Sequence, residues 1–254
     1  EGDGIGQPAF HHLDVLRHNL LTLECVDRVI EDAESFFPGH DEALAEYLAD
    51  PDAVMMLRWA ALFHDVGKPA TKKIVAEKGG RVTFYGHDEE GRWKFLAFAE
   101  RLRWSRHNRE NVAGLISMHM HPFHLCNVRR SEGGLSVRAR LKICRKAGNA
   151  LPGLFVLAMA DSLAGQGEDK PEGMEEEVAA LYSELGKMYR ESVVPVLDGP
   201  KLLTGHDLID TLGLAPGPWF KDILEALDLA VIDGEVKSRD GAVEWVSDYI
   251  ARKY

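Results

Sequence analysis

The sequence predicts an all-α protein that contains one small β-hairpin and ends in a small, separate helical unit. Apolar residues recur every three or four positions through most of the chain, as they do in amphipathic helices. Only residues 72–76 and 81–85 have the composition of strands, and they flank a Glu-Lys-Gly-Gly turn that is typical of a hairpin. Proline, aspartate and glycine residues separate the helical segments.

The same signals place each helix in chain order. Leucines at three- and four-residue steps from Leu13 onward predict a long first helix that continues to Ile30. A short helix follows over residues 41–48, and the pair Asp50-Pro51 begins another that carries its apolar run to Phe63. After the hairpin, helices are expected over residues 88–104, 109–119 (stopped by Pro122), 136–146, 152–164 and 174–190.

Composition divides the chain into three parts. Residues 1–165 are expected to form the main domain. Residues 166–200 are expected to form an acidic connector and helix, because residues 165–173 are rich in glycine, proline and charge. Residues 201–254 are expected to form the C-terminal unit, with helices near residues 206–212, 219–229 and 242–251. The chain does not begin with methionine, so we expect it to be a piece of a longer protein.

Charge is distributed unevenly along the sequence. The net charge is −11, yet residues 101–146 contain eleven Lys/Arg and only two acids, a local balance of +9 that leaves −20 for the remainder. Such segregation suits contact with a polyanion. It equally suits a solvated basic face that is balanced by acidic neighbours.

The cysteines and the hydropathy pattern bear on the cellular compartment. The three cysteines form no CxxC motif and leave one thiol unpaired, which predicts a reducing cytoplasm. We recognise no signal peptide and no apolar run long enough to span a membrane, since the run from Val54 to Phe63 ends at His64 and Asp65.

A histidine and an aspartate stand side by side where the apolar helix ends, in the run His64-Asp65-Val66-Gly67-Lys68-Pro69. Adjacent residues in mid-helix point about 100° apart and rarely share a target. At a helix end, both can turn toward one ion. Mixed nitrogen and oxygen ligands from several helices are what metal-dependent phosphate chemistry needs, and four further candidates follow the chain: His18, His87, His119 and Asp161.

Each of these residues also has a structural explanation. A single histidine among leucines is more often a core residue than a ligand. Asp161 is harder to explain in this way, because an unpaired carboxylate in an apolar helix is costly unless a cap, an arginine or a metal holds it. Taken together, the ordered set favours a site for one or two divalent ions, and its mixed ligands fit Mn, Fe, Co, Ni, Zn or Mg.

These ligands, with residues 64–68 (HDVGK) and 86–91 (GHDEEG), resemble the HD superfamily of metal-dependent phosphohydrolases. Residues 11–18 (HHLDVLRH) and 101–105 (RLRWS) resemble, more narrowly, the HD region of the bacterial tRNA nucleotidyltransferase/poly(A) polymerase family. Residues 203–209 (LTGHDLI) and 213–218 (GLAPGP) resemble that family's RNA-binding tail.

The resemblance implies an HD-type helical bundle and a core metal site made of His18, His64, Asp65 and Asp161, and His87 and His119 would complete the site of a second ion. Asp65 would bridge two ions, and an activated water would attack phosphorus. Lys68 would neutralise a phosphate oxygen or only cap its helix. His11, Asp14 and His18 are spaced three and four residues apart and would share one helix face. His11 and Asp14 would support the site, with Asp14 orienting His18 or acting as a further ligand. His121 or His124 could protonate a leaving group, although surface histidines are the simpler reading.

The implied substrates are phosphomonoesters or 2′,3′-cyclic phosphodiesters of nucleotides or RNA ends. No strand-borne pair of polymerase carboxylates is recognisable, so we expect a polymerase head in the intact protein and no nucleotide addition by this chain. Arg101, Arg103, Arg129 and Arg130, with Trp104 for stacking, are possible contacts to tRNA or another RNA. The alternative is a non-catalytic RNA-binding body in which these residues only brace the helices.

Overall fold

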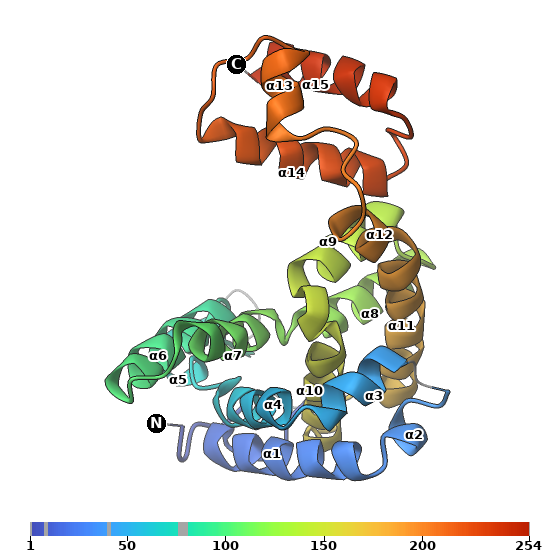
Figure 1. The fold of residues 1–254 in the computed structure, drawn as a ribbon. Helices are drawn as coiled ribbons and strands as arrows, with labels where there is room; N and C mark the ends of the chain where they lie inside the picture. The colour runs from blue at the N-terminus through green and yellow to red at the C-terminus, as the bar shows by residue number, and fades with distance from the viewer. Residues whose placement is uncertain (1, 8–9, 40–41, 76–80, 254) are drawn as a thin grey trace. The chain divides into compact units, whose positions relative to one another are not determined.

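The computed structural model describes residues 2–7, 10–39, 42–75 and 81–253 and is predominantly helical, as predicted (Figure 1). The chain divides into two compact units. Unit 1 contains residues Glu1–Leu135 and Ala147–Gly186, and unit 2 contains Ser136–Lys146 and Lys187–Tyr254. The units therefore interleave in sequence, because the segment after residue 135 belongs to unit 2 and the chain then returns to unit 1.

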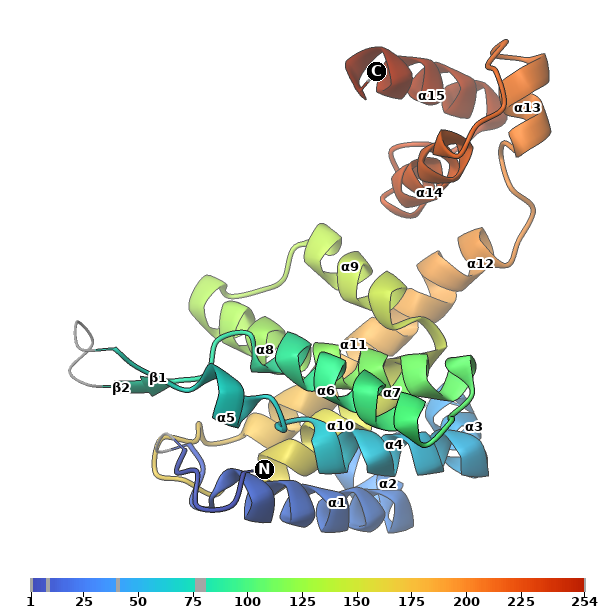
Figure 2. The same ribbon diagram turned by 90° about the vertical axis from the view of Figure 1, so that its left-hand side faces the viewer.

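Unit 1 contains the HD-type bundle and the hairpin. Its helices are α1 (Val15–Glu31), α2 (Ala33–Phe36), α3 (Glu42–Ala49), α4 (Pro51–Phe63), α5 (Lys68–Thr71), α6 (His87–Arg101), α7 (Arg106–Met118), α8 (His121–Glu132), the 3-10 turn η2 (Gly148–Ala150), α10 (Leu151–Ala164) and most of α11 (Met174–Met188). The strands β1 (Lys73–Val75) and β2 (Arg81–Thr83) pair antiparallel, with Lys73 opposite Thr83. They project from the helices (Figure 2), and the predicted turn over residues 76–80 lies outside the described residues.

Helix α10 forms the centre of unit 1. Its sequence from Leu151 to Ala164 is apolar on every side, and nearly every residue in it is buried, as expected for a helix that is surrounded by others. It packs against α1, α3, α4, α7 and α8. Pro152 lies in its first turn, where a missing N–H is tolerated. Asp161 is the one charged residue in this helix, so its carboxylate is carried into the core.

The sequence prediction missed the short helices α2, α5 and α12 (Val194–Leu197) and one long helix, α8. Pro122 was expected to stop a helix, but it lies in the first turn of α8, directly after the end of α7. Proline is compatible with both positions, because it ends a preceding helix and also favours the start of a new one. The chain therefore turns between α7 and α8 within a few residues and places His119 at the turn.

Unit 2 contains α9 (Val137–Ala147), the π-helical turn η3 (Tyr189–Val193), α12 (Val194–Leu197), α13 (Gly205–Asp210), α14 (Trp219–Ile232) and α15 (Arg239–Lys253). Its last three helices share a core that includes Leu208, Ile223 and Val246. Thr204 and Asp207 form a reciprocal capping box at the start of α13, and Arg239 pairs with Asp207.

One finding differs from the hydropathy expectation. The helical stretch Val137–Ala164 is long and apolar enough to cross a membrane by length and composition. However, 72% of its most apolar window is buried inside the protein. A helix buried in a protein core can have the same length and apolar composition as a membrane-spanning helix.

Candidate metal centre

All six predicted metal ligands lie in unit 1 and are buried. His18 comes from α1 and Asp161 from α10. His64 is the C-cap of α4 and is followed by Asp65, and His119 is the C-cap of α7, while His87 is the first residue of α6. Five separate helices therefore deliver these side chains to one region, which is why their spacing in sequence is irregular.

Three of the histidines are oriented by the same local contact. Nδ1 of His64, His87 and His119 lies 2.8, 2.8 and 2.7 Å from the carbonyl oxygen three residues earlier, on Ala61, Phe84 and Ile116. A carbonyl oxygen only accepts hydrogen bonds, so Nδ1 carries the proton and the lone pair of the neutral ring is on Nε2. Helix ends have carbonyls without intrahelical partners, so this contact also caps α4 and α7.

The first group of ligands is formed by His18, His64 and Asp161. His18 Nε2 lies 2.9 Å from Asp161 Oδ1 and 3.3 Å from His64 Nε2, and His64 Nε2 lies 3.7 Å from Asp161 Oδ1. Ligands at about 2.1 Å from one ion, in tetrahedral or octahedral geometry, lie about 3.0–3.4 Å from each other. The spacing of these three atoms suits a single divalent ion.

The second group is formed by Asp65, His87 and His119. The Nε2 atoms of His87 and His119 are 3.1 Å apart, and they lie 3.3 and 3.6 Å from Asp65 Oδ1. Since both Nδ1 atoms donate to carbonyls, two lone pairs face each other across 3.1 Å. A proton or a cation between them removes this repulsion.

Asp65 connects the two groups. Its Oδ1 faces His87 and His119, while its Oδ2 lies 3.3 Å from His64 Nε2 and 3.7 Å from His18 Nε2. Neither oxygen has a hydrogen bond of ordinary geometry in the part of the chain that the structure describes. A buried carboxylate without such bonds is costly unless cations surround it. The residues therefore fit one or two divalent ions, with Asp65 between them.

The charges in this cluster shift the acidities of its members. Burial opposes ionisation of Asp65 and Asp161, yet Lys68 and His64 hold the pKa of Asp65 well below its usual value, and His64 and His18 lower the pKa of Asp161. Burial disfavours the charged form of His64, but the carboxylates of Asp65 and Asp161 raise its pKa overall. Burial lowers the pKa of His119, and the neighbouring rings of His87 and His64 add to this effect.

The motif glycine Gly67 allows α6 to approach Asp65. A Cβ atom at this position would lie 2.1 Å from the carbonyl oxygen of His87 and 2.6 Å from the amide nitrogen of Gly91. Gly91 is itself packed against Ile116 of α7. The chain after Asp65 and the first turn of α6 are thus in backbone contact, which brings His87 close to Asp65.

Lys68 points into the site rather than only capping its helix. Its Nζ lies 2.5 Å from Asp65 Oδ2, donates to Gln7 Oε1 at 2.6 Å, and lies 3.5 Å from His11 Nε2. Gln7 was not identified from the sequence, because an isolated glutamine ahead of the first helix carries no signal there. It donates in turn to the carbonyl of Leu13, which fixes its side chain.

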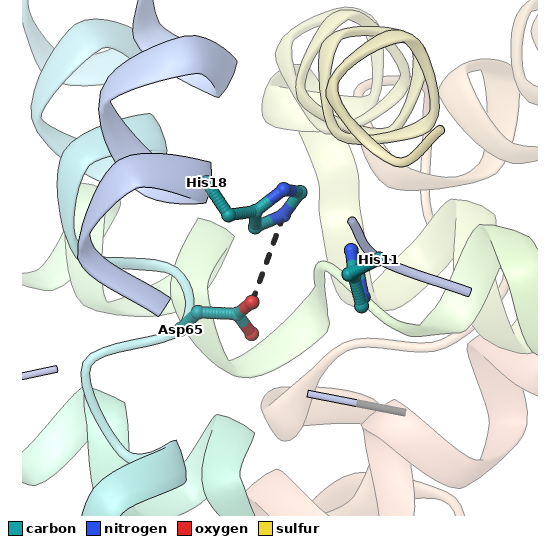
Figure 3. A group of neighbouring side chains, drawn as sticks. All are labelled: His11, His18 and Asp65. Carbon is teal, nitrogen blue, oxygen red and sulfur yellow. Dashed lines mark ion pairs between the residues drawn. The ribbon is translucent and has the colours of Figure 1, made fainter. Parts of the chain in front are cut away.

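The two residues predicted to support the metal ligands have different positions. Figure 3 shows His11, His18 and Asp65 around one space, and the rings of His11 and His18 are 4.3 Å apart. Burial, with the charge of Lys68, lowers the pKa of His11 to about 3. Asp14 differs from the prediction that it shares a helix face with His11 and His18. It is the N-cap of α1 and accepts from the backbone N–H of Arg17, because the helix begins only at Val15.

A cavity of about 600 Å³ opens onto the cluster. Asp65, Asp161, His87, His11 and Lys68 lie on its polar side, and His124 also borders it. Aromatic and apolar side chains, among them Phe10, Phe84, Tyr85, Met120, Phe123 and Met174, line much of the rest, together with the polar residues Thr83, Asp88, Asn127 and Asp169. A ligand in this cavity would meet both the candidate metal ligands and apolar walls.

The residues predicted to contact RNA separate into two kinds. Arg129 and Arg130 of α8 pair with Glu184 and Glu177 of α11, at 3.7 and 2.7 Å. Arg101 and Arg103 are exposed. Trp104, which was expected to be available for stacking, is partly buried: its ring packs edge-on against Trp59 and Phe95, with centroid distances of 5.3 and 5.7 Å.

Comparison with known families agrees with this geometry. The model of the HD domain family matches residues 41–165, and the model of a second family, tRNA nucleotidyltransferase domain 2 (putative), matches residues 182–246. The chain is an HD-domain region of the tRNA nucleotidyltransferase family. The HD match begins after α1, so Gln7, His11 and His18 lie outside the matched segment.

Two of the curated relatives of this chain are named tRNA nucleotidyltransferases. The A-adding tRNA nucleotidyltransferase of Deinococcus radiodurans is 32% identical over 93% of the chain, and the CC-adding tRNA nucleotidyltransferase of Thermus thermophilus is 34% identical over 76%. A multifunctional CCA protein of Actinobacillus pleuropneumoniae is 29% identical over 70%. The chain covers only 46%, 39% and 38% of these relatives, less than half of each.

Proposed function

We propose that the HD domain is a metal-dependent phosphohydrolase that acts on phosphate esters of nucleotides or RNA ends. The observation that carries the proposal is the convergence of four imidazole Nε2 atoms and two carboxylates, with Asp65 between two ligand groups. A structural role alone does not account for this arrangement, because acceptor atoms that face each other within a core are destabilising.

The residues of the cluster would have separate roles in hydrolysis. His18, His64 and Asp161 would hold one ion, His87 and His119 the other, and Asp65 both. Divalent ions bound here would acidify a water and polarise the phosphoryl group. Lys68 is placed beside Asp65 at the cavity and would donate a charge-assisted hydrogen bond to a phosphate oxygen, with Gln7 holding the ammonium group.

The cavity supports a nucleotide or RNA end as substrate. Its aromatic and apolar walls suit a base, while the charged end suits one phosphate ester. Two of the relatives are named tRNA nucleotidyltransferases, so an RNA 3′ end or a 2′,3′-cyclic phosphate is the substrate class we propose. The intact protein would combine this HD region with a polymerase head.

Metal content and turnover test the proposal directly. Purified protein is loaded separately with Mn²⁺, Co²⁺ or Ni²⁺, its bound metal is measured, and hydrolysis of 2′,3′-cyclic AMP and p-nitrophenyl phosphate is followed. We expect one or two ions per chain and metal-dependent turnover that chelation abolishes. Bound metal without hydrolysis of either substrate would contradict the enzymatic assignment.

A non-catalytic RNA-binding body is the second candidate function. It is favoured by the names of two relatives, which describe A-adding and CC-adding nucleotidyltransferases rather than hydrolases, and by the chain's coverage of less than half of each relative. In that case the protein would bind tRNA but contain no stoichiometric metal and hydrolyse neither substrate.

Lys68 has a predicted effect that separates substrate contact from metal binding. We expect Lys68→Met to retain its metal and lose about 10- to 100-fold in kcat/KM, because one charge-assisted hydrogen bond to phosphate contributes about 1.5–3 kcal/mol. The exposed Lys73 of β1 provides a matched control, and Lys73→Met should hydrolyse at the wild-type rate. Loss of metal from Lys68→Met would instead show that Lys68 supports the ligands.

A further inference from the structure

The turn between α6 and α7 exposes three arginines within six residues. The two helices run side by side in both views (Figures 1 and 2), and Arg101 ends α6 while Arg106 begins α7. Arg103 lies between them, in the left-handed region with φ of 56°. All three side chains are exposed. The free end of this helix pair is therefore strongly basic.

Backbone and core contacts hold this turn in one conformation. The N–H of Arg103 donates to the carbonyl of Glu100, and the N–H of Trp104 to that of Ala99, both at 3.0 Å. The ring of Trp104 packs edge-on against Trp59 and Phe95, and Ser105 caps α7 by accepting from the N–H of Asn108. A turn that is already ordered loses little entropy on binding a partner.

None of the three arginines has an acidic partner within the described residues. The nearest acid in sequence, Glu100, pairs with Arg109 at 3.5 Å. Five further arginines of unit 1 do have acidic partners: Arg17 with Asp14, Arg58 with Asp27, Arg92 with Glu89 and Glu110, Arg129 with Glu184, and Arg130 with Glu177. The turn thus concentrates uncompensated positive charge in a chain with a net charge of −11.

We propose that Arg101, Arg103 and Arg106 bind the phosphate backbone of an RNA. Guanidinium groups match phosphate oxygens in geometry and charge, and backbone contacts need no apolar surface. An acidic protein partner fits less well, because protein interfaces centre on aromatic or apolar anchors. Here the aromatic residue Trp104 points inward, and Leu102 is the one large apolar side chain exposed in the turn.

This inference rests on the proposed function only in assuming that the ligand is an RNA. A binding measurement tests it and requires no hydrolytic activity. Binding of 5′-labelled tRNA is measured by fluorescence anisotropy over a range of salt concentrations. The variant combines Arg101→Ala, Arg103→Asn and Arg106→Ala, with asparagine chosen because it tolerates positive φ. We expect affinity to fall about tenfold or more, and the slope of log K against log salt to decrease by about 2 to 3.

A matched variant with Arg129→Ala and Arg130→Ala controls for overall charge. Both residues come from the same basic stretch, but their guanidinium groups already contact acids, so we expect a smaller loss of affinity and a smaller change in salt slope than in the triple variant. The triple variant should keep the wild-type melting temperature and hydrolyse p-nitrophenyl phosphate at the wild-type rate.

Three results would overturn the inference: wild-type affinity and salt slope in the triple variant, an equal loss in the Arg129/Arg130 variant, or displacement of tRNA by polyglutamate as effectively as by unlabelled tRNA. The last would identify an acidic polypeptide as the partner. Weaker tRNA binding by the triple variant, in a protein that hydrolyses nothing, would refute the hydrolase proposal alone. Hydrolysis with unchanged RNA binding would refute only the arginine site.

Discussion

Replacing Asp65 by alanine is expected to abolish binding of both ions and to lower hydrolysis by more than about a hundredfold, since even residues that only support metal ligands contribute about 10- to 100-fold. Its two oxygens face different ligand groups, so the loss of one side chain removes a ligand from each. The measurements are metal content per chain and kcat/KM for 2′,3′-cyclic AMP.

The fold should survive this substitution. Asp65 follows the end of α4 and accepts no hydrogen bond of ordinary geometry from the described residues, and Lys68 keeps Gln7 as an acceptor when the carboxylate is removed. We therefore expect a helical circular dichroism spectrum close to that of the wild type. Full metal content and full hydrolysis in Asp65→Ala would refute the assignment of the ligands.

The second large effect is expected at Gly67. In Gly67→Ala the new methyl group would lie 2.1 Å from the His87 carbonyl oxygen, far inside van der Waals contact, and 2.6 Å from a backbone nitrogen of α6. Neither backbone atom can move without moving α6. We expect a loss of about 1–3 kcal/mol in the free energy of unfolding, as for other overpacked sites, and weaker binding of the ion held by His87 and His119.

Gly114 of α7 provides the control. A Cβ atom there meets no other atom within 4 Å, so Gly114→Ala should be neutral or stabilise the protein by up to about 1 kcal/mol through helix propensity. Chemical denaturation and metal titration of both variants make the comparison. Equal stability and equal metal affinity in Gly67→Ala would show that α6 can shift without affecting the site.

Local sequence signals identified much of the fold. Apolar spacing and cap residues located α1, α4 and α10, because these features depend on residues within a few positions of each other. The missed helix α8 shows the limit of such signals, since Pro122 is compatible with both a stop and a start. Asp14 shows the same limit, because a shift of one residue in the start of the helix decides whether an aspartate caps the helix or lies on one of its faces.

The sequence alone determined the chemistry available: histidines and aspartates at helix ends, an aspartate inside an apolar helix, and a basic stretch around residues 101–146. Tertiary structure decided how these groups are used. It brought six ligands from five helices together, placed Gln7 beside Lys68, and packed the ring of Trp104 against Trp59 and Phe95. It also paired Arg129 and Arg130 with α11, while Arg101, Arg103 and Arg106 have no acidic partner among the described residues. The physical reason is that coordination, ion pairing and burial depend on distances between residues far apart in the chain, which no local pattern encodes.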